Sequence, residues 1–226
     1  YAVADCRGLD YALKRATQHF QTVWRSYHCE ATPAQLTVEH LQASLEQMVA
    51  AAQPQDTLLL YFAGHGVLDP DHQDLFLCLP ETRREALATT GWKVHDILRT
   101  LEQSRIQRQV MILDACYSGS ISFSGSRDGG LPADPASHLT GHRTIDAPIP
   151  SPAEETASPT IQPEDDPNYV PALYQALQDY GNRSQRDFYA LLSCRDNEKS
   201  WELPACGHGA FTYQLIQGIG DVSTTD

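Results

Sequence analysis

The sequence predicts an α/β fold: an open, mostly parallel sheet with helices on both faces, interrupted by a long flexible linker. Short apolar, β-rich runs at residues 57–62 and 109–115 are typical of buried strands in a parallel sheet. Each run follows a stretch with helical apolar spacing. Strand and helix therefore alternate along the chain, which favours a sheet covered on both sides.

Two amphipathic helices are predicted by apolar residues that recur every three or four positions. The residues of the first helix are Leu41, Leu45, Met48 and Val49, and those of the second are Val94, Ile97, Leu98 and Leu101. Further strands are expected at residues 75–80 and 188–194. A helix is expected at residues 9–20, and a last one around Phe211, Leu215 and Ile216.

Residues 118–168 lack apolar periodicity and hold more than half of the chain's 14 prolines. We expect a flexible linker that divides one domain into parts at residues 1–117 and 169–226. A passive insertion and a region for proteolytic processing remain equal alternatives here. The chain begins shortly before a helix and ends soon after another, so we expect a longer parent protein.

Composition excludes some classes of partner. The chain has 16 basic and 29 acidic residues and a formal charge of −13, which disfavours nucleic acid and anionic membranes and suits a cationic substrate. No apolar run approaches the roughly 20 residues that cross a bilayer. We expect a soluble, cytoplasmic protein with reduced cysteines. Because the cysteines form no CxxC pairs, a zinc site or a redox sensor is the last of the alternatives.

A histidine and a cysteine follow the two predicted central strands. His65 and Cys116 are 51 positions apart, and glycines at 64, 66 and 119 flank them. Carboxyl ends of parallel strands meet at one edge of a sheet, where ligands bind. A thiol becomes a nucleophile as thiolate, and a nearby imidazole takes its proton. The pair therefore predicts a nucleophilic cysteine and its base.

Three separated motifs resemble those of the caspase-like cysteine peptidases, especially metacaspases and orthocaspases. They are YFAGHG at 61–66, LDACYSG at 113–119, and YALLSCRDNEKSWE at 189–202 followed by HGAFTYQL. The resemblance implies that His65 is the general base and Cys116 the nucleophile, with the backbone amides of Gly66 and Cys116 as the oxyanion hole. It also implies that residues 1–117 are large-subunit-like and residues 169–226 small-subunit-like, and it requires no catalytic carboxylate.

The same resemblance implies a preference for a basic residue before the cut bond. Asp114 stands where caspases have glutamine, and Asp5 where metacaspase-like proteins have a second pocket aspartate. Glu202 stands where caspases have an arginine, in a segment that also brings Ser200 and Trp201 to the substrate. Desolvated carboxylates favour arginine over lysine because a guanidinium binds them in a bidentate way.

Three of these residues have a simpler alternative. Asp5 can cap a helix that begins near residues 6 and 7, Glu202 can be a solvated loop residue, and Trp201 can pack without touching substrate. A catalytically silent interaction or regulatory module is the rival to the whole interpretation. Another branch of the same clan, with a different substrate residue, is the second rival.

The predicted partners are proteins or peptides with a basic residue before the scissile bond. If the pocket accepts arginine, self-cleavage is expected at Arg127 or Arg143 in the linker, or at Arg183 or Arg186 beyond it. The aspartates at residues 69, 71 and 74 resemble part of a calcium-binding loop. Their spacing lacks the glycine and glutamate of a calcium loop, so we expect turn residues and no required metal or cofactor.

Overall fold

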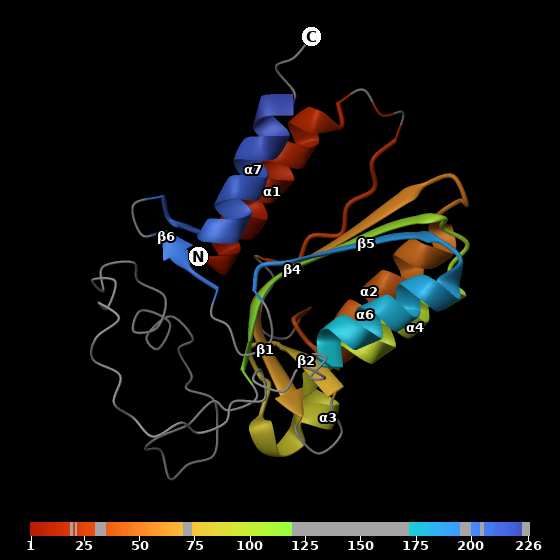
Figure 1. Ribbon diagram of the computed structural model, residues 1–226, viewed down its shortest axis with the longest axis vertical. Helices are drawn as coiled ribbons and strands as arrows, with labels where there is room; N and C mark the ends of the chain where they lie inside the picture. The colour runs from red at the N-terminus through yellow and green to blue at the C-terminus, as the bar shows by residue number, and fades with distance from the viewer. Residues whose placement is uncertain are drawn as a thin grey trace, which may run out of the picture.

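The computed structural model describes residues 1–18, 20, 22–29, 35–69, 74–118, 172–194, 200–203 and 206–222, with the side chains of 116–118, 172, 221 and 222 outside the description. Nearly all of the predicted linker lies outside these ranges. The described part is mixed α/β, as predicted (Figure 1).

A five-stranded sheet in the order β3-β2-β1-β4-β5 forms the centre of the fold. Its strands are β1 (Thr57–Asp69), β2 (Asp74–Cys78), β3 (Gly91–Lys93), β4 (Arg108–Ser118) and β5 (Asp187–Leu192). β4 pairs in parallel with β1 and β5, and β2 and β3 are antiparallel. A separate short hairpin joins β6 (Glu202–Leu203) and β7 (His208–Gly209).

Helices cover both faces of this sheet (Figure 1). They are α1 (Ala2–Ala16), α2 (Val38–Ala51), α3 (Leu87–Thr90), α4 (Val94–Gln103), α6 (Ala172–Ser184) and α7 (Ala210–Val222), with a 3-10 turn, η2, at Arg84–Ala86. α2, α4 and α6 lie on one face, and α1 and α7 run side by side over the other.

The alternation of β4 explains the two layers. Met111, Leu113 and Ala115 are fully buried in the hydrophobic core with residues of α2, α4 and α6. Successive residues of a strand belong to opposite faces, so Asp114 is on the side of α1 and α7. α1 and α7 approach closely because residue 8 is glycine: a Cβ there would lie 2.7 Å from Ile216 Cδ1.

The predicted faces of α2 and α4 are confirmed, since Leu41 and Leu45 are buried in α2 and Val94, Ile97, Leu98 and Leu101 in α4. The prediction for residues 9–20 was wrong in its bounds, because the helix begins at Ala2 and ends at Ala16. Its buried face, Asp5, Leu9 and Ala12, continues the helical spacing into the first turn, whereas Phe20 is 63% exposed.

The two central strands are longer than predicted. β1 and β4 stay paired through Val67 and Ser118, so the segments that contain His65 and Cys116 belong to the strands rather than to loops after them. The predicted strand at residues 75–80 is present as β2, but it is antiparallel. α6 was not predicted. None of the helices in the described ranges has both the length and the apolar character needed to span a bilayer.

Candidate active site

His65 and Cys116 occupy paired positions on neighbouring parallel strands. The β1–β4 register matches His65 with Cys116, and two residues earlier it matches Ala63 with Asp114. Adjacent strands lie about 4.8 Å apart. The pairing between β4 and β5 ends at Leu113 and Leu192, so in the described sheet the last five residues of β4 pair only with β1.

Two buried carboxylates from different elements meet at β7. Asp5 of α1 and Asp114 of β4 are each only 2% exposed. Asp5 Oδ1 accepts hydrogen bonds from Gly209 N at 3.0 Å and from His208 Nδ1 at 2.9 Å. Asp114 Oδ1 accepts from Ser200 Oγ at 2.8 Å, and Asp114 Oδ2 from Thr212 Oγ1 at 2.6 Å.

Gly209 lies beside both carboxylates. A Cβ on this residue would lie 2.8 Å from Asp114 Oδ2 and 3.3 Å from Asp5 Oδ2. Both oxygens therefore lie within 3.3 Å of one point above the glycine Cα. A side chain at position 209 would occupy the space onto which the two acids converge.

The environment disfavours the charge of Asp5. Burial raises the pKa of this carboxyl, and the nearby Asp114 raises it further, while the hydrogen bonds from His208 and Gly209 act in the opposite direction. Two like charges in a buried place are costly unless a cation joins them. The cluster is therefore suited to bind a positively charged group.

A chain of hydroxyls extends from Asp114 to β1. Because the Thr212 hydroxyl donates to the carboxylate, it accepts from the Tyr61 hydroxyl at 2.7 Å. Burial is the main reason that the pKa of Tyr61 lies far above its usual value, so the phenol stays protonated and remains a donor. Thr212 is fully buried and fixes the orientation of Asp114.

The segment around β6 places its three predicted residues in different environments. Ser200 is buried on Asp114, as described above, and Trp201 is 54% exposed. Glu202 is 1% exposed and lies opposite Gly209 in the hairpin, so it is not the solvated loop residue of the alternative interpretation. Asp5 lies within α1 and does not cap a helix.

The remaining predicted residues lie apart from this cluster or outside the described residues. Arg127 and Arg143 lie outside, as does Asp71. Arg183 is within α6, and Arg186 donates to Ser104 O at 2.6 Å. Asp69 and Asp74 are paired across β1 and β2, and Asp74 forms an ion pair with Lys93 at 2.5 Å.

Sequence reasoning missed three members of the cluster: His208, Gly209 and Thr212. All three lie in the HGAFTYQL motif, which had been used only to recognise the small-subunit-like part. His208 and Gly209 contact Asp5 of α1 some 200 positions away in the chain, and Thr212 contacts Asp114 of β4. No local sequence pattern reports such contacts. Gly66 is buried in β1 and pairs with Tyr117, next to the His65–Cys116 pair.

Comparisons with known proteins address the family of this chain. A solved structure of a structural-genomics protein from Geobacter sulfurreducens is 17% identical, with a TM-score of 0.46, over 94% of this chain and 71% of that one. A comparison with curated proteins gave no significant match. The model of the peptidase C14 family, described as the caspase domain, matches residues 2–225. The chain therefore belongs to the caspase-domain family of cysteine peptidases.

Proposed function

We propose that the chain is a cysteine endopeptidase that cleaves after arginine, and less well after lysine, with His65 as base and Cys116 as nucleophile. The observation that carries this proposal is the register of β1 and β4, which pairs His65 with Cys116 and, one step back on the same face, Ala63 with Asp114. The proposed nucleophile, its base and the acidic cluster are then neighbours on β1 and β4.

The proposed reaction is acyl transfer. The Cys116 thiol gives its proton to His65 and attacks the substrate carbonyl, the amine leaves with that proton, and water hydrolyses the acyl-enzyme. The backbone amides of Gly66 and Cys116 are proposed to stabilise the oxyanion.

The acidic cluster is proposed to select the substrate residue. A guanidinium between Asp5 Oδ2 and Asp114 Oδ2 would relieve the repulsion between the two carboxylates and form charge-assisted hydrogen bonds out of water. An ammonium carries the same charge but lacks the planar fork, so lysine binds less well. Aspartate is repelled. Ser200 and Thr212 hold Asp114 in place through their hydrogen bonds. We assign the exposed Trp201 to the wall of a neighbouring subsite, and the buried Glu202 to a further negative charge near the pocket.

Four reporter peptides that end in Arg, Lys, Asp or Leu test the proposal. We expect cleavage in the order Arg, Lys, with Leu and Asp far behind, and the same rates with calcium and with a chelator. Cys116→Ala and His65→Ala are expected to lower the rate at least about 10³-fold. Cys206→Ala, which removes an exposed thiol, is the matched control and keeps full activity.

Three outcomes would contradict parts of the proposal. No cleavage of any reporter by a folded protein would favour the catalytically silent interaction or regulatory module. Preference for Leu or Asp would refute the role of the acidic cluster. Loss of activity in the chelator would show that a metal is required.

We further propose self-processing at Arg127 or Arg143. Arg183 and Arg186 are weaker candidates, because the first is within a helix and the second is bonded to the loop after α4, whereas peptidases bind extended chain. Incubation of the wild-type protein beside Cys116→Ala, followed by N-terminal sequencing of fragments, is the test. Identical intact bands from both proteins would end this proposal.

A further inference from the structure

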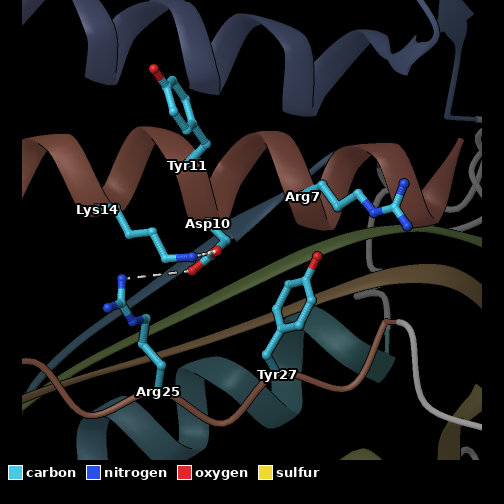
Figure 2. Close-up of a pocket in the computed structure, with 6 residues that line it drawn as sticks. All are labelled: Arg7, Asp10, Tyr11, Lys14, Arg25 and Tyr27. Atoms are coloured by element: carbon cyan, nitrogen blue, oxygen red, sulfur yellow. Dashed lines mark hydrogen bonds and ion pairs between the residues drawn. The ribbon is translucent and has the colours of Figure 1, made fainter.

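Residues 22–29 run along α1 in the opposite direction to the helix, and Figure 2 shows Arg25 and Tyr27 of this segment below Asp10 and Lys14 of α1. Arg25 Nη1 lies 3.9 Å from Asp10 Oδ1, and Lys14 also pairs with Asp10. The seam between the helix and the segment includes an open cavity of about 480 Å³. The segment is therefore attached near the middle of α1.

The same segment touches α1 a second time, at the first turn of the helix. The Cys29 thiol donates to Val3 O, with 3.9 Å between sulfur and oxygen. Asp10 is seven positions after Val3, which is about 10 Å of helix. Four residues of chain span up to about 13 Å, so the path from Arg25 to Cys29 covers this distance. Both contacts are therefore compatible with a single alignment of the segment along α1.

This alignment brings two thiols together. Cys6 follows Val3 by one turn of α1, so the Cys29 thiol that contacts Val3 O lies beside it, and both thiols are partly buried and free. A disulfide bond is about 2.05 Å long, so the two sulfurs must move closer together before the bond can form. Cys206 is also a free thiol, but it is exposed.

The segment, rather than the helix, can supply this movement. α1 is fixed by its buried Asp5, Leu9 and Ala12 and by the close approach of Gly8 to Ile216. Residues 22–27 are exposed, with Trp24 at 65%. On its other side the segment contacts α2, where Ser26 Oγ and His28 Nε2 lie 2.7 and 3.1 Å from Ser44 Oγ and the His28 ring meets the His40 ring edge-on, with 5.5 Å between centroids.

We propose that Cys6 and Cys29 are a covalent modification site, which a low-molecular-weight disulfide such as oxidised glutathione converts into a reversible intramolecular disulfide. In the first step a protein thiolate attacks one glutathione sulfur, forms a mixed disulfide and releases one glutathione thiolate. In the second step the other protein thiolate attacks the mixed disulfide and releases the second glutathione. Two protein thiols are oxidised, one glutathione disulfide is reduced, and the two thiol protons go to solvent or to glutathione.

Cys29 is the thiol that attacks first. Burial is the main reason that the pKa of Cys6 rises to about 12, with Cys29 and Asp5 adding to the shift. A thiol that stays protonated attacks an external disulfide slowly. Cys6 then resolves the mixed disulfide from a neighbouring position, where proximity compensates for its small thiolate fraction.

The crosslink would fasten the segment to the first turn of α1, at the residue that follows Asp5. Because the exposed segment yields and the helix stays in place, we expect the acidic cluster to keep its geometry. The bond also closes a loop of about two dozen residues in the unfolded chain, which stabilises the folded state. Oxidation is therefore expected to raise the melting temperature by about 5 °C without loss of the Asp5 contacts.

Peptide mapping tests the site directly. Cys116→Ala protein, in which the active-site thiol cannot react, is treated with oxidised glutathione, alkylated, and digested with trypsin and a glutamyl endopeptidase. We expect the peptide that ends at Arg7 to be linked to residues 26–30, and the link to disappear on reduction. Cys29→Ser in the same background must lose the linked peptide and the rise in melting temperature, and Cys78→Ser must keep both.

The exposed Cys206 reports whether the oxidant reached the protein. Glutathione on Cys206 together with free Cys6 and Cys29 would overturn the proposal, and so would a stable glutathione adduct on Cys29 without the link. A linked peptide without a rise in melting temperature would overturn the stabilising role. None of these measurements depends on peptidase activity.

Discussion

Gln109 and Asp114 are both buried in β4, but they belong to opposite faces of the sheet and are satisfied in different ways. The Gln109 amide donates to Leu101 O, Ser104 Oγ and Ile106 O, and its carbonyl accepts from Tyr180 at 2.5 Å. These groups are neutral and mutually complementary, so the arrangement costs little and fixes how α4 and α6 pack on the sheet.

Asp114 has equally good hydrogen bonds and yet lies beside another buried acid. Ser200 and Thr212 satisfy its two oxygens, but the pKa of neighbouring Asp5 is raised by burial and then by Asp114. The free energy of unfolding would be higher with one neutral residue in this place. The face of α4 and α6 therefore stabilises the fold, whereas the face of α1 and α7 holds two neighbouring acids, which we propose bind a cationic side chain.

Among variants of the α1 and α7 face, Gly209→Ala is expected to lower the cleavage of the arginyl reporter most. The new methyl would stand 2.8 Å from Asp114 Oδ2, in the space proposed for the guanidinium. We expect kcat/KM for the arginyl reporter to fall at least about 100-fold, because small displacements of a bound substrate have effects of this size. The measurement is steady-state cleavage by protein with a native circular dichroism spectrum.

Gly218→Ala is the matched control, since a Cβ at that position of α7 meets nothing within 4 Å. It should cleave the reporter like wild type and be slightly more stable. Full arginyl activity in Gly209→Ala would mean that the substrate side chain binds elsewhere.

Asp114→Asn is expected to have the next largest effect on arginyl cleavage. It keeps the hydrogen-bonding shape of the residue but removes the charge, so we expect kcat/KM for the arginyl reporter to fall about 10- to 100-fold. The ratio of arginyl to leucyl cleavage should fall with it. Asp96→Asn, on the surface of α4, is the control. An unchanged ratio in Asp114→Asn would contradict the role of this carboxylate.

The fold was more predictable from sequence than the site. Periodicity located α2 and α4, because Leu41, Leu45, Ile97 and Leu98 recur at helical spacing and are buried. α6 has the same signal, Leu173, Leu177 and Tyr180, but it lies just past the proline-rich stretch, whose composition predicts a linker. His208 and Gly209 act through contacts with α1, and such long-range contacts leave no local pattern.

Asp5→Asn is expected to affect activity and stability in opposite directions. The pKa of Asp5 is raised in the folded state, so the folded protein holds this proton more tightly than the unfolded chain. The wild-type protein loses that stability as the pH rises through the raised pKa. At neutral pH we therefore expect Asp5→Asn to melt at a higher temperature than wild type while it cleaves the arginyl reporter more slowly.

The pH dependence provides the check on this explanation. The stability difference between Asp5→Asn and wild type should shrink as the pH is lowered from neutral, and vanish once Asp5 is protonated in both states. Urea unfolding at several pH values measures it. A difference of constant size would mean that packing around the new amide, and not the charge, determines the effect.

Tyr180→Phe should have the smallest effect on catalysis, because it acts on the opposite face of the sheet. Tyr180 is fully buried, and its hydroxyl is a donor to Gln109 Oε1. Without that donor the free energy of unfolding should fall by about 1–2 kcal/mol. Urea unfolding would measure this loss, while kcat/KM for the arginyl reporter stays at the wild-type value. A variant that lost activity in proportion to stability would show that the two faces are coupled, and Asp114 would then owe its position to the α6 side of the sheet as well as to Thr212.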